Sequence, residues 1–290
     1  MDMIVQALVS GLAMGSIYAL IAIGFSITWC TTKSLNFGQG DFLMFGTLIG
    51  LSCYLVFNLP FVVSLLIAVV IMGLLGCLLE RLAIRPIRHI VTYGWVVSTI
   101  GMGIILKNLA MLIWGSNQIN FPSPFGDTVV RVLGAGIYPQ EIVVIAVSVV
   151  VLSALDIFQR KTIIGKALLA TAWNTSWASL MGIDVNKMVI LAFMVSSGLA
   201  AMGGILVAPI TSAWVLMGST LGLKAFCAAI LGGLESSRGC IAGGLLLGIT
   251  EFLIASWEPN LKDFSVFALL ILALTIRPQG IFAAAKVEKV

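Results

Sequence analysis

The sequence predicts an all-α, polytopic membrane protein, and three observations lead to that fold class. Of the 290 residues, 60% are hydrophobic and only 10% are charged. The mean hydropathy is +1.13, which is far too apolar for a soluble chain of this length. Apolar runs of about 20 residues, the length needed to cross a bilayer, recur from one end to the other. The loops between these runs are short, so we expect residues 1–290 to form a single transmembrane domain.

Nine apolar segments are predicted to enter the membrane, which corresponds to eight to ten transmembrane or re-entrant helices. In order, they are Ile4–Trp29, Phe37–Phe57, Phe61–Leu79, Tyr93–Trp114, Ile142–Phe158, Met188–Ile210, Leu221–Leu234, Ile241–Trp257 and Phe264–Ile276. The seventh segment is short and contains Lys224. We therefore expect it to be re-entrant or buried behind other helices.

Basic residues predict the orientation, because cytoplasmic loops of membrane proteins are enriched in lysine and arginine. With nine spans and the N-terminus outside, twelve of the sixteen lysines and arginines lie on the cytoplasmic side. These twelve are Lys33, Arg81, Arg85, Arg88, Arg160, Lys161, Lys166, Lys187, Arg238, Arg277, Lys286 and Lys289. Only Arg131 and Lys262 fall outside. The formal net charge of +4 therefore reflects membrane topology, and we expect no nucleic-acid partner.

Two connecting loops are long enough to do more than join helices. The outer loop, Gly115–Glu141, contains three prolines and four glycines. We expect it to cap the helices, with contact to an external partner as the alternative. The cytoplasmic loop spans residues 159–187 and contains a polar segment, Gly165–Asp184. In so apolar a chain, this polar segment is the strongest indication of a specific function.

The polar segment has the pattern of a short amphipathic helix. Its apolar residues recur at i, i+4, i+8 and i+11, which places them on one stripe. They are Leu169, Trp173, Trp177 and Leu180. The opposite side, which we expect to face outward, carries Thr171, Asn174, Thr175 and Ala178, and Gly182 offers a stop. The helix would either dock on another protein or lie along the membrane and anchor the loop through Trp173 and Trp177.

The sequence contains no set of residues that would support catalysis. A nucleotide-binding loop requires Gly-x4-Gly-Lys-Ser/Thr, but here Arg160 holds the first position and Ala167 replaces the hydroxyl. The only histidine lies in a basic loop, and no zinc motif is present. We therefore expect no catalytic residue, no metal ligand and no cofactor bound by this chain.

Seven polar residues fall inside the predicted spans, where ionisable groups are costly and face a protein interior or water. They are Asn36, Gln39, Asp41, Lys107, Asn108, Lys224 and Glu251. The four charged residues would form two buried ion pairs or line a permeation path, and the sequence does not decide which charges pair. Gly38 and Gly40 weaken the helix beside Asp41, and broken helices at membrane depth usually line a cavity.

Seven stretches, in the expected order, carry a resemblance to a known family. They are GSIYALIAIGF at Gly15–Phe25, LNFGQGDFLMFG at Leu35–Gly46, ERLAIRPIR at Glu80–Arg88, TIGMGIILKNLA at Thr99–Ala110, the polar segment, LGLKAFCAAILGGLESSRGCIAGGLLLG at Leu221–Gly248, and RPQGIF at Arg277–Phe282. Over essentially its whole length, the chain resembles the permease subunit of the branched-chain amino-acid class of bacterial ABC importers.

This resemblance implies a type II ABC importer fold, a translocation path between two permease subunits, and a coupling helix that docks on the ATPase. The coupling helix maps onto Ala172–Gly182, with ATPase-coupling residues Ala172, Trp173, Asn174, Thr175, Ser176, Ala178, Ser179, Met181 and Gly182. The translocation-path candidates are Asn36, Phe37, Gly38, Gln39, Gly40, Asp41 and Lys224. We expect the gating backbone in Gly38–Gly46 and Leu221–Gly233.

The resemblance also implies partners and a location. The partners are a second permease subunit, favoured to be a different chain, two ABC ATPase subunits that hold ATP and Mg, and a periplasmic substrate-binding protein. The location is the bacterial inner membrane, with the N-terminus periplasmic and the C-terminus cytoplasmic. Family substrates include branched-chain and other amino acids, urea, short amides and aromatic acids, so the solute stays open. A secondary transporter or channel without an ATPase is the alternative from another class.

The sequence departs from the family pattern in two places. Glu235 and Arg238 stand where a glycine and a proline are common, and we expect them to form a local exposed ion pair of little energy. Asp41 stands where glutamate is more usual. These departures leave the expected fold in place and bear only on the choice of substrate.

Overall fold

A computed structural model gives the structure of residues 2–87, 94–126, 129–132 and 135–282, and most of these residues are helical. Its elements, in chain order, are α1 (Asp2–Thr32), α2 (Gln39–Leu55), α3 (Phe61–Leu79), the π-helical turn η1 (Glu80–Ile84), α4 (Gly94–Trp114), β1 (Val130–Val132), β2 (Ala135–Ile137), α5 (Pro139–Lys161), α6 (Ile163–Trp173), α7 (Thr175–Leu180), α8 (Val185–Thr211), α9 (Met217–Gly232), α10 (Ser237–Ala255), the 3-10 turn η2 (Pro259–Leu261) and α11 (Lys262–Ile276). The predicted all-α fold is confirmed.

Seven helical stretches in the described part of the chain are long and apolar enough to cross a membrane. They correspond to seven of the nine predicted segments. The other two segments form the shorter helices α2 and α9, of 17 and 16 residues. At ~1.5 Å per residue these helices are about 26 and 24 Å long, less than the ~30 Å hydrocarbon core of a bilayer. Together, the seven long stretches and the two shorter helices make nine, which agrees with the predicted range of eight to ten transmembrane or re-entrant helices.

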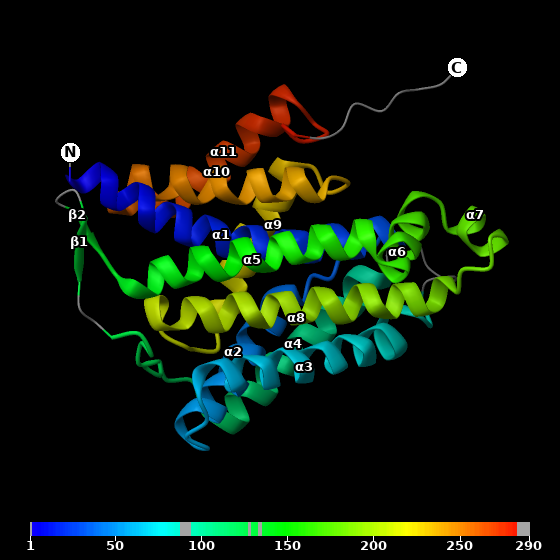
Figure 1. Ribbon diagram of the computed structural model, residues 1–290, viewed down its shortest axis with the longest axis horizontal. Helices are drawn as coiled ribbons and strands as arrows, with labels where there is room; N and C mark the ends of the chain where they lie inside the picture. Colours follow the sequence, from blue (N-terminus) through cyan, green and yellow to red (C-terminus); the bar gives the residue numbers. More distant parts are fainter. Residues whose placement is uncertain (1, 88–93, 127–128, 133–134, 283–290) are drawn as a thin grey trace.

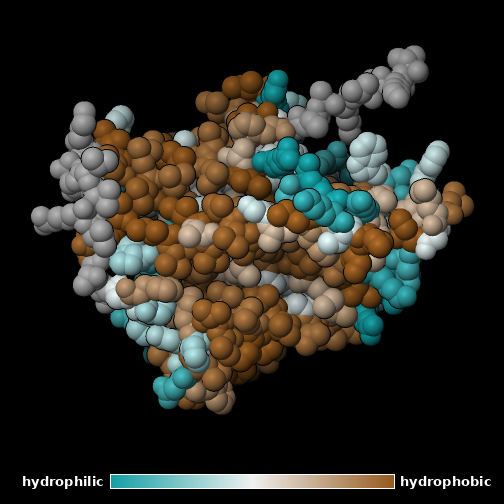
Figure 2. Space-filling view, in the orientation of Figure 1, coloured by the Kyte–Doolittle hydropathy of each residue, from teal (hydrophilic) through white to brown (hydrophobic). Residues whose placement is uncertain are grey.

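The long helices run side by side, with α1 and α8 at the centre of the bundle (Figure 1). Helix α1 packs on α5, α8, α9 and α10, and α8 packs also on α2 and α3. In their most apolar windows, 78% of α1 and 72% of α8 is buried, against at most 39% of any other candidate span. Hydrophobic residues cover the middle of the visible face, and hydrophilic residues gather toward its two ends (Figure 2). Such a surface fits a protein that crosses a bilayer.

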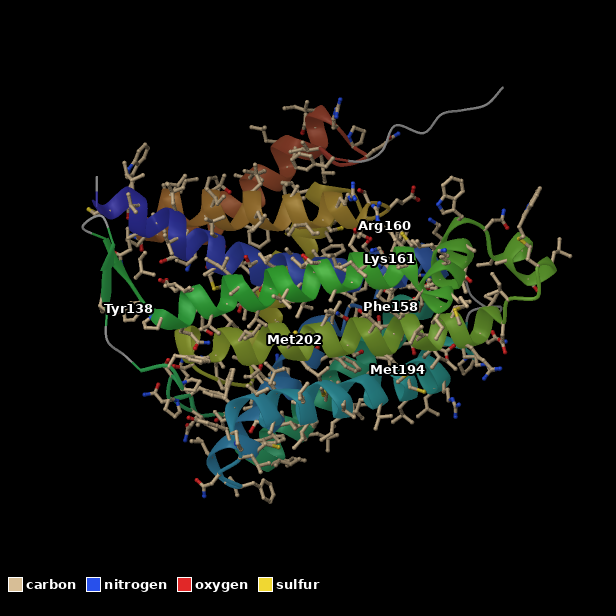
Figure 3. All side chains as sticks on the ribbon, in the orientation of Figure 1. Tyr138, Phe158, Arg160, Lys161, Met194 and Met202 are labelled. Carbon is tan, nitrogen blue, oxygen red and sulfur yellow. The ribbon has the colours of Figure 1, made fainter. Side chains whose placement is uncertain are left out.

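The two ends of the bundle carry different elements. Strands β1 and β2 lie at one end, and α6 and α7 lie at the other (Figure 1). Helix α5 runs between them, from its cap at Tyr138 to Arg160 and Lys161 in its last turn (Figure 3). Some predicted features lie outside the described residues, namely Arg88, Lys286 and Lys289 of the cytoplasmic set and Tyr93 at the start of the fourth segment.

Glycines set the distance between α1 and α10. Gly11 and Gly15 of α1 face the backbone of α10 at Gly248 and Gly244. A Cβ at Gly15 would lie only 2.9 Å from the carbonyl oxygen of Gly244, and one at Gly11 only 2.9 Å from that of Gly248. Lipid is as apolar as the helices, so spanning helices associate through close van der Waals contact rather than through hydrophobic burial. The absence of side chains at these positions is what permits that contact.

Helices α2 and α9 meet at a glycine crossing formed by Gly40, Gly218 and Gly222. A Cβ at Gly222 would lie 2.6 Å from the Cα of Gly40, and a Cβ at Gly218 would collide with the Gly40 carbonyl oxygen. Backbone meets backbone here, so no side chain can rotate away to make room. The spacing of the two helices is therefore fixed by these three residues.

The outer loop, Gly115–Glu141, contains the antiparallel hairpin β1–β2, which was not predicted from the sequence. Ahead of the hairpin, Phe121 stacks on Tyr54 with ring centroids 5.4 Å apart. Ile119 exchanges two backbone hydrogen bonds, of 2.8 and 2.9 Å, with Ala213. These contacts fasten the loop to the end of α2 and to the segment between α8 and α9. This arrangement agrees with the expectation that the loop caps the helices.

We predict that Gly222→Ala destabilises the protein, because the new Cβ would push α9 away from Gly40. The expected loss is about 1–3 kcal/mol, the usual cost of overpacking, measured as a lower thermal unfolding temperature of the solubilised protein. Gly101→Ala is the matched control, since nothing lies within 4 Å of the Cβ that it would add. Alanine in that helix should be neutral or stabilising by up to ~1 kcal/mol. Equal losses for both variants would contradict the glycine crossing.

Candidate functional site

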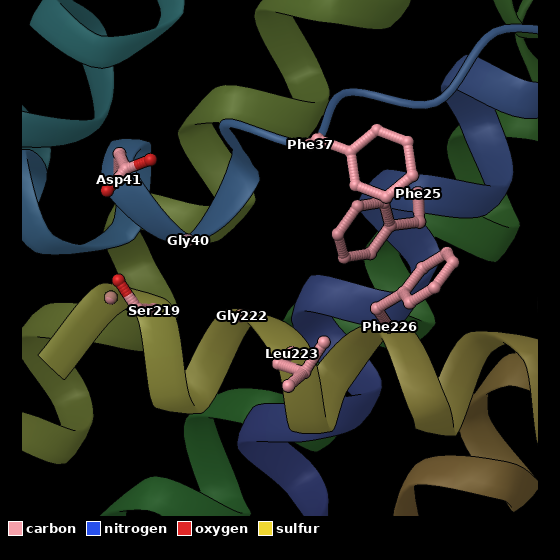
Figure 4. A pocket seen from close by; sticks show the side chains of 9 residues that line it. Phe25, Phe37, Gly40, Asp41, Ser219, Gly222, Leu223 and Phe226 are labelled. Atoms are coloured by element: carbon pink, nitrogen blue, oxygen red, sulfur yellow. The ribbon is translucent and has the colours of Figure 1, made fainter. Parts of the chain in front are cut away.

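A cavity of about 210 Å³ lies beside the glycine crossing, between α1, α2 and α9 (Figure 4). It is lined by Phe25, Phe37, Gly40, Asp41, Gly218, Ser219, Gly222, Leu223 and Phe226. Pockets for drug-sized ligands measure ~300–1,000 Å³, so this cavity suits a smaller solute. Ser219 and Leu223 are exposed. The cavity is therefore open to the surface of the chain along α9.

The segment that precedes α2 is not helical, and buried amides hold it in place. The Asn36 side chain accepts a 3.1 Å hydrogen bond from the N–H of Gly38 and donates one of 3.3 Å to Gln39 Oε1. The Gln39 amide donates to the carbonyl oxygen of Ser196 on α8 at 2.9 Å and accepts from the Ser196 hydroxyl at 3.1 Å. Broken backbone at membrane depth persists only where its polar groups are satisfied. This network explains how the chain turns at Phe37.

The two ends of the cavity differ in chemistry (Figure 4). At one end, the Asp41 carboxylate lies on the same side as Ser219 of the facing helix. At the other end, the ring of Phe226 lies 5.6 Å from that of Phe25 and 5.7 Å from that of Phe37, measured between centroids. The cavity thus combines one anionic end with one aromatic end.

The predicted path residues divide into those that line this cavity and those that do not. Phe37, Gly40 and Asp41 line it. Those that do not are Asn36, Gly38, Gln39 and Lys224. Asn36 and Gly38 precede α2 and Gln39 begins it; all three are buried, and they position the lining residues rather than face the cavity.

Lys224 belongs instead to an ion-pair network between α9, α10 and α11 that is buried at Glu251 and reaches the surface at Asp263. Its Nζ lies 2.7 Å from Glu251 Oε1 and 2.6 Å from Asp263 Oδ1. Tyr18 of α1 donates a 2.9 Å hydrogen bond to Glu251 Oε2, and Lys262 Nζ lies 3.6 Å from Oε1. The Glu251 side chain is fully buried, where an unpaired charge would be most costly. Lys224 therefore ties α9 to the helices behind the cavity.

The four intramembrane charges do not form two separate ion pairs. Lys224 pairs with Glu251. Among the described residues, however, no ion pair of 4.0 Å or less joins Asp41 to Lys107. Asp263 and Lys262 of α11 join the pair of Lys224 and Glu251, whereas Asp41 lines the first cavity.

Within the described part of the chain, Glu235 and Arg238 do not form the expected local pair. Glu235 pairs with Lys33 at the end of α1, at 2.9 Å, and Arg238 lies 3.9 Å from Asp156 near the end of α5. Both partners come from distant parts of the chain that the fold brings to the same end. Spacing along the sequence could not indicate them.

The polar segment Gly165–Asp184 is not the single helix that was predicted. It forms α6, breaks at Asn174 and then forms the short helix α7. Asn174 has extended backbone, and its side-chain oxygen accepts hydrogen bonds from the N–H groups of Ser176 (3.0 Å) and Trp177 (3.1 Å). Such a cap starts a new helix instead of continuing the old one. The predicted stop at Gly182 is confirmed, since its φ is +83°.

The predicted outer face of this segment is wrong at two of its four residues, whereas Asn174 is exposed and Thr175 is partly exposed. Thr171 and Ala178, which were expected to face outward, are only 0% and 2% exposed, because such small side chains let α6 and α7 pack closely on their neighbours. The most exposed side chains of the segment include four that are large and apolar. They are Trp173, Trp177, Leu180 and Met181, exposed by 92%, 72%, 87% and 81%. We call these four residues the apolar tip; they lie on or beside α7, the short helix that projects at one end of the bundle (Figure 1).

A second cavity, of about 350 Å³, separates the break between α6 and α7 from the end of α1. It is lined by Cys30, Thr31, Thr32, Lys33, Thr171, Ala172, Trp173, Asn174, Thr175 and Ser176. Of the remaining predicted coupling residues, Ala178 is buried, and Ser179, Met181 and Gly182 are exposed. Only three residues separate Lys33 from Phe37. A short stretch of chain therefore joins this cavity to the first one.

Comparison with known proteins shows the family to which this chain belongs. Residues 7–274 match the model of the family described as the permease component of the branched-chain amino acid transport system. The chain belongs to this permease family. The permease is 35% identical to the high-affinity branched-chain amino acid transport system permease protein LivH of Escherichia coli K12, over 98% of this chain and 97% of the relative. It is 33% identical, over the same shares, to the corresponding protein BraD of Pseudomonas aeruginosa. A probable LivH of Methanocaldococcus jannaschii is 28% identical over 92% of this chain and 88% of the relative.

Family membership confirms the resemblance that the seven stretches indicated. The permease is a membrane component of an importer rather than an enzyme. Its apolar helices make it a multi-pass protein of the inner membrane.

The sequence-based prediction missed several residues that line the first cavity of the permease, or placed them only within a longer segment. Gly222, Leu223 and Phe226 fall within the predicted gating segment Leu221–Gly233, but none was singled out. The residues outside every predicted set are Phe25, Gly218 and Ser219. The spacing of four between Gly218 and Gly222 was the available signal, since it places two glycines on one helix face.

We predict that Glu251→Ala lowers the stability of the permease by about 3–5 kcal/mol, because it leaves Lys224 without its buried partner. The measurement is thermal unfolding of the solubilised protein. Glu258→Ala serves as the control, since Glu258 is an exposed carboxylate just beyond the same helix. Replacing both members of the pair by methionine should cost less than Glu251→Ala alone. An unchanged unfolding temperature for Glu251→Ala would show that the network is not structural.

Proposed function

We propose that this permease forms one side of the translocation path of an ATP-driven importer for branched-chain or other aliphatic amino acids. The family match over nearly the whole chain supports the importer, and the names of the relatives support the solute class. The observation that carries the coupling part of the proposal is the apolar tip, a set of exposed large side chains on and beside the short capped helix α7.

The partners in this proposal follow from what the chain lacks and leaves open. A second permease subunit, different in sequence, would complete the open side of the first cavity. Two ATPase subunits would hold ATP and Mg, since the permease sequence has no nucleotide-binding loop. A periplasmic binding protein would deliver the amino acid to the outer end of the bundle. The permease itself would bind no cofactor.

The apolar tip would dock in a cleft of the ATPase. Exposed apolar patches mark contacts with proteins or membranes. The apolar tip has four large exposed side chains, one from the end of α6 and three from α7 and the residue that follows it. When ATP closes the ATPase pair, α7 would be pushed against the end of α1 across the second cavity. Motion at Lys33 would reach Phe37 through the short segment between them, and so alter access to the first cavity. Alternating access would result.

The orientation in this proposal places α7 in the cytoplasm, the N-terminus in the periplasm and the C-terminus in the cytoplasm. Exposed cations at the α7 end support it, among them Lys33, Arg160 and Lys187. Lysine and arginine are enriched in the cytoplasmic loops of membrane proteins, which favours the cytoplasmic side for this end of the bundle.

We predict that Trp177→Asp uncouples transport. Trp177 is 72% exposed, so the change should leave the fold of the permease intact while placing a charge in an apolar contact. ATPase activity stimulated by the loaded binding protein should fall at least tenfold, and the ATPase subunits should no longer copurify with the permease. Trp257→Asp is the matched control, because Trp257 is 85% exposed in the turn after α10.

The two variants decide between docking and membrane anchoring. If Trp177→Asp retains the ATPases and full uptake, α7 is not the coupling helix. If it instead releases the permease from the membrane or prevents its insertion, the tip is an interfacial anchor.

The proposed orientation predicts the outcome of cysteine labelling in intact cells. A cysteine at Ser176 should resist a membrane-impermeant maleimide, whereas one at Asn260 should react, because the two exposed sites lie at opposite ends of the bundle. Both should react after the cells are opened. The reverse pattern would overturn the proposed orientation.

A further inference from the structure

The first cavity is polarised in a way that coupling to an ATPase does not require. Its anionic end is a single carboxylate, Asp41, and its other end is the aromatic trio Phe25, Phe37 and Phe226. Figure 4 shows the carboxylate and the three rings on opposite sides of the cavity, with the glycine crossing between them. A ligand that fills both ends must carry a cationic or hydrogen-bond-donating group beside an apolar one.

The Asp41 carboxylate has no hydrogen bond and no ion pair of 4.0 Å or less within the described part of the chain. It packs against Gly103, where any Cβ would collide with it. Lys107 lies one turn further along the same face of α4 and attracts Asp41 only through space. Glu251, by contrast, has every oxygen paired. A half-buried carboxylate at membrane depth is costly until a donor reaches it, and the cavity is the route by which one can.

The aromatic end offers apolar surface of fixed shape. Phe25 is almost fully buried, and Phe37 is held by stacking on Trp95, with centroids 6.1 Å apart and planes inclined by 7°. Phe226 packs against both Phe25 and Phe37 and is partly exposed. Rings held in this way favour contact with an aliphatic group, which gains from leaving water without having to form hydrogen bonds.

We propose that this cavity is a transit site for an aliphatic amino acid, with its ammonium group on Asp41 and Ser219 and its side chain among the three phenylalanine rings. This inference rests on the proposed function, since it requires that the amino acid pass through the permease. Both groups of such a ligand branch from one α-carbon, which matches a cavity of only about 210 Å³ with opposite ends of opposite chemistry. One carboxylate and one hydroxyl make few contacts, so the site is weak. A transported solute must be able to leave.

The direct test uses photo-leucine, a leucine analogue with a diazirine in its side chain, on the assembled permease–ATPase complex in nanodiscs without the binding protein. Labelling should map to peptides that contain Phe25, Phe37 or Phe226. Leucine and 3-methylbutylamine, which both carry the ammonium group, should compete. 4-Methylpentanoate, which lacks it, should compete at least tenfold less well. Labelling elsewhere, or equal competition by the amine and the acid, would overturn the transit site.

Matched variants separate the two ends of the site. Asp41→Asn should reduce labelling at least tenfold and Asp41→Glu by less than threefold. Asp156→Asn, which changes a partly exposed carboxylate of α5 outside the cavity, should have no effect. Phe226→Ala should reduce labelling about tenfold, and Phe264→Ala, an exposed ring on α11, should not. Full labelling of Asp41→Asn would contradict the assignment of the ammonium group.

Uptake measurements distinguish this inference from the proposed function. In proteoliposomes with every subunit, Asp41→Asn should lower leucine uptake at least tenfold while the loaded binding protein still stimulates ATP hydrolysis. Loss of both activities in a correctly assembled complex would assign Asp41 to coupling and overturn the transit site. If the unaltered complex shows no ATP-dependent uptake at all, the proposed function fails, and the labelling pattern still reports whether the cavity binds an aliphatic ammonium compound.

Discussion

Contact of backbone with backbone at glycine positions is the constraint on which the rest of this structure depends. Lipid offers helices no hydrophobic reason to associate, so they must approach closely enough for dispersion to hold them. Between α1 and α10, Gly11 and Gly15 provide that approach at the centre of the bundle. Between α2 and α9, the same device brings the start of α2 against α9 and leaves a cavity beside it. The cavity exists because Gly40, Gly218 and Gly222 exclude side chains from the point of contact.

The protein treats its intramembrane charges in two ways. Glu251 is buried and satisfied from every side by Lys224, Tyr18 and Lys262, so its charge serves to join helices. Asp41 is half-buried and has no such partners among the described residues. The first arrangement resists change because each member would be costly without the others. The second leaves a carboxylate available to a ligand. It lies at the start of α2, where the buried amides of Asn36 and Gln39 already hold the backbone in place.

The helices and their order could be predicted from the sequence, because the length of an apolar run reports directly on whether it can cross a bilayer. The break in the polar segment could not, because Asn174 caps a new helix by a local competition that a stripe of apolar residues does not reveal. Part of the cavity was predictable, since the glycines around Asp41 mark a broken helix. Phe25 was not, because it reaches the cavity only through tertiary packing. The pairing of Lys33 with Glu235 spans 202 residues and is equally invisible to local patterns.

The glycine crossing also limits how such a permease can diversify. Larger residues at Gly40, Gly218 or Gly222 would push α2 away from α9. They would destabilise the fold, so they are a poor route to a change in the transported solute. The freedom to acquire a new cargo is therefore concentrated in the few side chains that point into the cavity from an otherwise fixed frame. Leu223 is among them, and it lies on the exposed side of α9, away from the glycine contacts with α2. Evolution of selectivity and evolution of stability thus act on separate, adjacent residues of one short helix.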